Sequence, residues 1–373
     1  MSGMFVFAFP YEPVSHGLVG KTYNLLITSS ITGMSVIGTI ILRFRILHPS
    51  STVTRSQAMC AALMFQAGTL GSIVLLGQWI FPIPFAAISC GGVGLTLMVL
   101  CWIGFEDPAQ RRHIRTPLLS MALSYTNVLV HEAIGVLYTN QKDYSLAQAA
   151  AACCLPLAKY IGRYTQMKLL HSHREGFANA IISFEVELFN VLYTSVFLQR
   201  TESLLMMVVL MGVDVAENLY FLSSLEKAAE TLSHQDRFTR EKARLLFRCE
   251  MVVLVELIEV VAPLVYAIYI VCIWHSPLKQ FYRHFEDVSE PQFYGSLGNV
   301  ILLAGLQGFC LGLFMWRLHY KHRVPVIAQL GFAIREYRWV IVPTLIIWFN
   351  IVISTPIEHM GNDYSFSFLF GGA

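Results

Sequence analysis

Apolar residues in this chain fall into blocks of about 17–25 residues, the length that an α-helix needs to cross the hydrocarbon of a bilayer. Of the 373 residues, 55% are hydrophobic and 13% are charged. Soluble domains carry about 25% charged residues, so this chain lacks the polar coat of a water-soluble fold. The pattern predicts an all-α fold, a polytopic transmembrane helix bundle that forms a single transmembrane domain over residues 1–373.

Ten blocks are read as spans, and their bounds are good to a few residues. They cover residues 23–43, 57–80, 83–105, 117–138, 144–161, 176–198, 203–223, 251–274, 294–316 and 339–357. The fifth is the weakest, because it is short and Ala-rich and contains Pro156 and Lys159. The connection 224–250 has strong helix formers and mixed charge, so we expect a cytoplasmic or interfacial helix that extends the seventh span or lies on the membrane surface.

The distribution of basic residues tests the span count. Connections that follow odd-numbered spans hold 21 of the 26 Lys and Arg residues, with Lys159 and Arg163 counted in the connection after the fifth span. Cytoplasmic loops collect Lys and Arg, and a wrong span count would scramble the alternation. The pattern therefore predicts ten spans with both termini outside or lumenal, in the plasma membrane or an endomembrane.

Several function classes find no support in the motifs. The net charge of +2 gives no reason to expect nucleic acid as a partner, which leaves the lipid bilayer as the expected one. The chain has neither a nucleophile elbow nor a Cys/His spacing typical of zinc sites. An enzyme is therefore the less favoured class, and no catalytic residue or organic cofactor is predicted.

Carboxylates inside the predicted spans are the feature that points to function, because charges at such positions are rare and costly. The sixth, seventh and eighth spans carry three pairs, and the fourth span adds a His–Glu dipeptide assigned to an outer access route or a second site. In chain order these residues are His131, Glu132, Glu185, Glu187, Asp214, Glu217, Glu256 and Glu259.

Spacing indicates which carboxylates can act together. The pairs in the seventh and eighth spans are each three residues apart, so each pair shares a helix face. Glu185 and Glu187 are two apart and point to roughly opposite sides, so one of them at most joins a common site. Pro263 leaves the carbonyl of Glu259 without its amide donor, a feature that transporters use to bind ions.

The cluster has two readings that the sequence leaves open. The clearly apolar parts of these spans contain no Lys or Arg, and like charges in a low dielectric cannot all stay ionised. Either the carboxyls hold protons or a hard cation, or they are protonated and hydrogen-bonded to neutral neighbours such as Asn190 or Ser195.

A glycine pair marks a packing seam in the ninth span. Gly308 and Gly312 form a small-xxx-small pattern, which lets two helix backbones approach closely in lipid. The seam is predicted to lie within the bundle or between the subunits of a homo-oligomer.

Part of the chain resembles a large oomycete (water mould) family of multi-pass membrane proteins. The resemblance rests on Phe189-Asn190, Leu192-Tyr193, Asp214, the run Val253 to Val261 with Pro263 and Tyr266, and the C-terminal GNDYSFSF at 361–368. It covers about half of the chain and weakens toward the N-terminus. It implies a multi-pass topology and carries over no activity and no functional residue.

The leading hypothesis is a cation- or proton-coupled transporter, or an ion channel, with its site among the sixth, seventh and eighth spans. One alternative is a non-transporting scaffold, sensor or receptor whose buried carboxyls only organise the bundle. The other is an intramembrane metalloenzyme. The substrate cannot be read from the residues.

Overall fold

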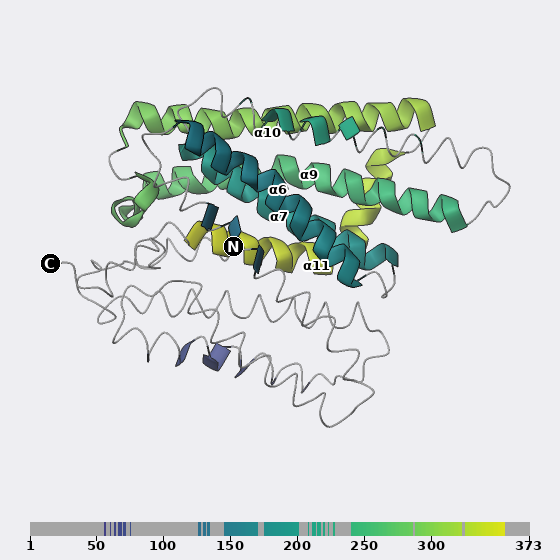
Figure 1. Cartoon of the computed structure of the whole chain (residues 1–373), viewed down its shortest axis with the longest axis horizontal. Coiled ribbons are helices and arrows are strands. Elements are labelled where there is room, and N and C mark those ends of the chain that lie inside the picture. The colour runs from purple at the N-terminus through teal and green to yellow at the C-terminus, as the bar shows by residue number, and fades with distance from the viewer. Residues whose placement is uncertain are drawn as a thin grey trace. The chain divides into compact units, whose positions relative to one another are not determined.

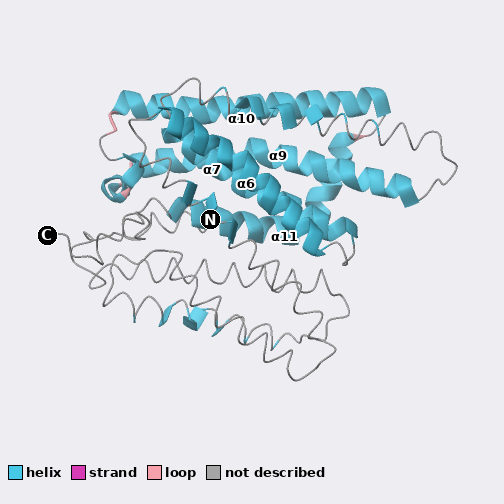
Figure 2. Cartoon of the chain, in the orientation of Figure 1, coloured by secondary structure: helices cyan, strands magenta, loops and turns pink. Residues whose placement is uncertain are grey.

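The computed structural model describes residues 145–170, 175–200, 240–285, 288–322 and 325–354, with scattered positions in 56–75, 126–134 and 208–227. All regular structure in these residues is helical, and none of them lies in an extended strand (Figure 2). The all-α prediction is therefore confirmed for the part of the chain that the structure describes.

Long helices dominate the described residues. They are α6 (Ser145–Leu170), α7 (Glu175–Arg200), α9 (Arg240–Trp274), α10 (Glu290–His322) and α11 (Val326–Ser354), with the short 3₁₀ helices η3 (Pro277–Phe281) and η4 (Arg283–Phe285) after α9 (Figure 1). The chain divides into two compact units. One holds residues 130–269 and 289–341, and the other holds 1–129, 270–288 and 342–373.

Helix boundaries differ from the expected ones at two places that affect the site. Helix α6 continues to Leu170, well past the expected end at 161, so Arg163, which was expected in the connection after the fifth span, lies in the same helix as Lys159. The second half of the 224–250 connection is the start of α9, which runs unbroken from Arg240 through Pro263.

The start of α10 is fixed by its own side chains. The backbone N–H and the hydroxyl of Ser289 both donate to Gln292 Oε1, at 3.0 and 2.8 Å. This reciprocal use of a Ser and a Gln three residues apart is the capping box, which satisfies amide donors that a helix leaves unpaired at its first turn.

In the unit 130–269 with 289–341, α6 packs against α7, and α7 packs against α10. Helix α9 runs antiparallel to α10, since Val260 Cγ1 lies 3.9 Å from a Cβ placed on Gly308, and Cys249 and Val253 pack with Phe314 and Leu318. Gly308 of the predicted glycine seam therefore faces α9, but a Cβ at this position would make only an ordinary contact, so the packing at Gly308 does not require a glycine. Gly312 is exposed, and a Cβ placed on it would have no atom within 4 Å among the described residues.

Among the described residues, two stretches of helix are long and apolar enough to cross a membrane. They are Cys249–Trp274 in α9 and Glu290–Lys321 in α10, with mean hydropathies of 2.3 and 1.8 over their most apolar windows. Helix α10 also exposes large apolar side chains along its length, including Ile301, Phe309 and Trp316. A contiguous apolar face of this kind suits contact with lipid or with another apolar surface.

The short helices after α9 belong to the other unit, and their aromatic side chains cluster with Trp274. Phe285 lies edge-on to Trp274, with ring centroids 5.1 Å apart, and it also contacts Tyr282 at 4.7 Å. The Lys279 ammonium lies 3.2 Å from the centroid of the Trp274 ring, in a cation–π contact. Ser276 starts η3 by accepting a hydrogen bond from the Leu278 amide.

Candidate functional site: a buried ion network on three helical segments

One face of α6 is polar although the helix is largely apolar. Lys159, Arg163 and Gln166 are spaced four and three residues apart, which places them on the same side of the helix. Glu187, Asn190 and Thr194 follow the same spacing on α7. Because α6 and α7 pack together, the two polar faces can meet.

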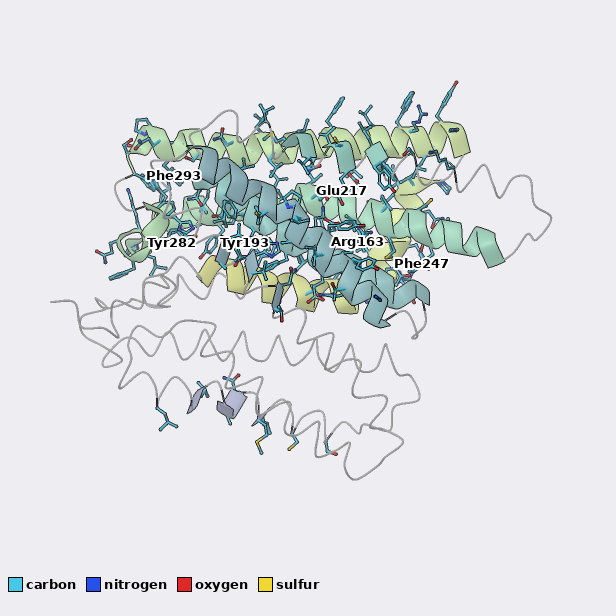
Figure 3. The ribbon with its side chains drawn as sticks, in the orientation of Figure 1. Arg163, Tyr193, Glu217, Phe247, Tyr282 and Phe293 are labelled. Atoms are coloured by element: carbon cyan, nitrogen blue, oxygen red, sulfur yellow. The ribbon has the colours of Figure 1, made fainter. Side chains whose placement is uncertain are left out.

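Lys159 is the centre of an ion network that joins three segments. Its ammonium lies 2.5 Å from Glu187 Oε2 on α7 and donates at 2.8 Å to Oε2 of Glu217, one of the helical positions described between 208 and 227. Arg163 Nη1, one turn along α6, donates to Glu187 Oε1 at 3.3 Å. Figure 3 labels Arg163 and Glu217, which are the outer members of this network.

The network is buried to different degrees at its two ends. The side chains of Lys159 and Glu187 are 4% and 1% exposed, whereas those of Arg163 and Glu217 are 24% and 28% exposed. Each buried charge in this group has at least one partner of opposite charge, which is the condition under which charges persist in a low-dielectric interior.

Two buried amide oxygens lie on the same two helices, α6 and α7. Asn190 Oδ1 on α7 and Gln166 Oε1 on α6 are fully buried and make no hydrogen bond to any described residue. Asn190 follows Glu187 by three residues on α7. Gln166 follows Arg163 by three residues on α6. Buried acceptors normally have a donor partner, so these two oxygens mark places that suit a water molecule or a cation.

The opposite side of α7 carries a separate aromatic group. His131 is fully buried, and its ring lies edge-on to Phe189 with centroids 4.8 Å apart and 5.5 Å from Tyr193. Residues 189 and 187 are two apart, so Phe189 faces away from Glu187. His131 therefore packs on the face of α7 opposite the ion network.

The remaining predicted carboxylates fall in three groups. Glu185 is buried on the far side of α7 from Glu187, and Glu256 and Glu259 are buried in α9. Asp214 and Glu132 lie outside the described residues. Within those residues, no group of three or more His, Cys, Asp or Glu side chains is arranged to hold a metal ion.

Two further buried side chains, Tyr266 and Ser195, donate structural hydrogen bonds. The Tyr266 hydroxyl on α9 donates to Gln199 Oε1 on α7, and Ser195 donates to the Val191 carbonyl of its own helix. Burial, with a smaller effect from Glu250 and Glu336, raises the pKa of Tyr337 in α11 to about 12.

Lys159 and Arg163 are the site residues that our sequence reasoning missed. The premise that the carboxylates lack basic partners holds for their own spans, but the partners come from the helix before them. The signal was present, since Lys159 stands inside an apolar segment and Arg163 follows it at helical spacing. A four-residue connection between α6 and α7 also favours an antiparallel pair of neighbours.

Comparison with known proteins adds no function to this geometry. The chain matches no protein-family model, no curated protein and no solved structure.

Proposed function

We propose that the protein is a multi-pass membrane protein that acts as a cation- or proton-coupled transporter or an ion channel, with the Lys159–Glu187–Glu217 network at its centre. One observation carries the proposal: a buried lysine is shared between two carboxylates from two other helical segments. Buried ion pairs add little net stability over apolar packing, and charges within membrane segments are typical of ion and proton pathways.

A lysine ammonium that is shared between two carboxylates is suited to being replaced at one of them by an incoming cation. Lys159 occupies the position that a proton or metal cation would need at either carboxylate, so the incoming charge competes with it. Because Lys159 can keep one carboxylate while releasing the other, the site can open without leaving the lysine unpaired. The same contacts join α6, α7 and the segment 208–227, so exchange at the network is coupled to how these segments pack.

The proposed architecture has ten spans with both termini outside or lumenal. Support comes from the ten apolar blocks, from the two apolar helical stretches of membrane length in α9 and α10, and from the exposed apolar face of α10. The alternation of basic residues persists after Lys159 and Arg163 are removed from the count. The oomycete family resemblance agrees with a multi-pass topology.

A structural scaffold is the second candidate, and it also has an observation in its favour. The hydrogen bond from Tyr266 to Gln199 joins α9 to α7 through neutral side chains, so polar contacts in this chain also serve to hold helices together. In that case the ion network would fix helix positions and exchange nothing.

Flux measurements on the full chain separate the two candidates. The purified protein is reconstituted into liposomes, and proton, Na⁺, K⁺ and Ca²⁺ fluxes are followed under imposed gradients, with protein-free liposomes as the control. The transport proposal expects flux of at least one of these ions above the control. A scaffold gives control-level flux for all four, and that result would rule out the transport proposal for these ions.

A further inference from the structure

One face of α10 is apolar and exposed along most of the helix. Its large side chains include Leu302, Phe309 and Leu313, which are 52%, 63% and 47% exposed. Trp316 and Tyr320 continue the same face toward the end of the helix, because all five residues follow one another at spacings of three, four or seven. A helix of membrane length with such a face requires an apolar medium or an apolar partner along it.

Aromatic side chains mark the two ends of this face. Tyr294 is 44% exposed near the start of α10, and Trp316 and Tyr320 near its end are 61% and 78% exposed, with their rings stacked at a centroid distance of 5.8 Å. Tyr294 and Trp316 are 22 residues apart, about 33 Å along an α-helix, which matches the hydrocarbon thickness of a bilayer. Tyr and Trp gather at both membrane–water interfaces, so this spacing favours lipid as the medium around the face.

A row of positive charge lies beside the stacked rings. Leu313, Arg317 and Lys321 follow one another at four-residue spacing, so they form a row on the helix surface next to the two rings. Arg317 and Lys321 are both exposed. The sequence from 291 to 335 contains no Asp or Glu, so the net charge carried by this stretch is positive. The apolar face of α10 therefore ends in a positively charged, aromatic edge.

We propose that this end of α10 binds an anionic phospholipid of the surrounding bilayer. The negatively charged headgroup pairs with Arg317 and Lys321, the acyl chains lie along the apolar face, and the two stacked rings lie at the level between them. A zwitterionic phospholipid has the same acyl chains but no net charge, so the two cations select against it. The assignment rests on the membrane placement in the proposed function and does not require transport.

Fluorescence quenching of Trp316 tests the site in the full chain. The protein is reconstituted into phosphatidylcholine liposomes with a minor fraction of phosphatidylglycerol or phosphatidylcholine that is brominated on an acyl chain near the headgroup, because bromine quenches a tryptophan that it contacts. The same measurement on Trp316→Phe isolates the contribution of Trp316 from that of the other tryptophans. We expect brominated phosphatidylglycerol to quench Trp316 more strongly than brominated phosphatidylcholine at the same mole fraction.

Arg317→Gln combined with Lys321→Gln removes the two cations and keeps the rings. Each Lys or Arg close to an anionic lipid surface strengthens binding about fivefold, so the preference for phosphatidylglycerol should fall by about 5- to 25-fold. The matched control is Arg335→Gln with Arg338→Gln, which removes two exposed arginines from α11. We expect the control to keep the preference to within about twofold, because salt screens charges that do not contact the lipid. An equal loss in both double variants would show that net charge alone attracts the lipid, and would overturn the site.

Two further results would also overturn the proposal. Equal quenching of Trp316 by the two lipids would show that the basic residues only stabilise the end of the helix or fix its orientation. Quenching by neither lipid would show that protein, such as a second copy of this chain, covers the face. These comparisons use the wild type and Trp316→Phe alone, so they hold even if a charge variant does not fold.

Flotation with pure phosphatidylcholine liposomes separates failure of this site from failure of the proposed function. A chain that does not float with them rejects the membrane placement itself. A chain that floats but shows no lipid preference rejects only the phospholipid site. Because quenching reports lipid contact and not flux, a preference for phosphatidylglycerol in a protein that transports none of the tested ions would leave the site in place and reject transport of those ions.

Discussion

Replacing Lys159 with Met removes the cation at the centre of the network and leaves a side chain of similar length. Breaking a buried ion pair by removing one partner typically costs about 3–5 kcal/mol. Two features of this site reduce that value. Glu187 retains Arg163 at 3.3 Å, and Glu217, at 28% exposure, can be partly solvated. We therefore expect Lys159→Met to lower the free energy of unfolding by about 2–3 kcal/mol.

A double-mutant cycle isolates the interaction from other effects of the substitution. Glu217→Gln is combined with Lys159→Met, and the free energy of unfolding is measured by chemical denaturation in mild detergent with tryptophan fluorescence. Because the two side chains are in contact, we expect a coupling energy of about 1–2 kcal/mol, so the double variant loses less stability than the sum of the single variants.

Lys168 provides a matched control for the cycle. It is an exposed lysine in the last turn of the same helix, so Lys168→Met should change stability by no more than about 0.5 kcal/mol. If the effects of Lys159→Met and Glu217→Gln instead add to within about 0.5 kcal/mol, the two side chains do not interact and the description of the network is wrong.

Three further outcomes follow from the structure. Tyr266→Phe leaves the buried Gln199 amide without its hydroxyl donor and should lower the free energy of unfolding by about 1–3 kcal/mol in the same denaturation assay. Gly308→Ala should be tolerated because its Cβ would meet Val260 at an ordinary 3.9 Å, whereas Gly308→Leu overpacks the α9–α10 contact and should cost about 1–3 kcal/mol, measured against Ala. Peptide tags on both chain ends should be labelled from outside in right-side-out vesicles, and protection of either tag would reverse the orientation or make the span count odd.

Helix content and approximate helix positions could be predicted from apolar periodicity and length. The chain between 145 and 200 shows where this reasoning was imprecise. Apolarity declines after residue 161, yet α6 continues to Leu170, because helix formation depends on backbone hydrogen bonding and on packing against α7 as well as on apolarity. The expected end of the fifth span therefore left Arg163 outside the helix that also carries Lys159.

The carboxylates of the candidate site could be predicted from the sequence, but their basic partners could not. Glu187 and Glu217 could be singled out because carboxylates in apolar segments are conspicuous. Spacing along α7 also predicted that Glu185 and Glu187 face opposite sides. The identity of the partner could not be read in the same way, because contacts between α6 and the segment 208–227 depend on helix packing over about 60 residues of separation. Local patterns do not encode such contacts.

The most direct measurement is ion flux through the charge-balanced double variant, Lys159→Met with Glu217→Gln, reconstituted beside the wild type in identical liposomes. Size-exclusion profiles and unfolding curves first establish that both proteins are folded and present in equal amounts. If the network is the exchange site, the wild type conducts protons or a metal cation and the double variant falls to the level of protein-free liposomes. Undiminished flux through the folded double variant would contradict the assignment of transport to this network.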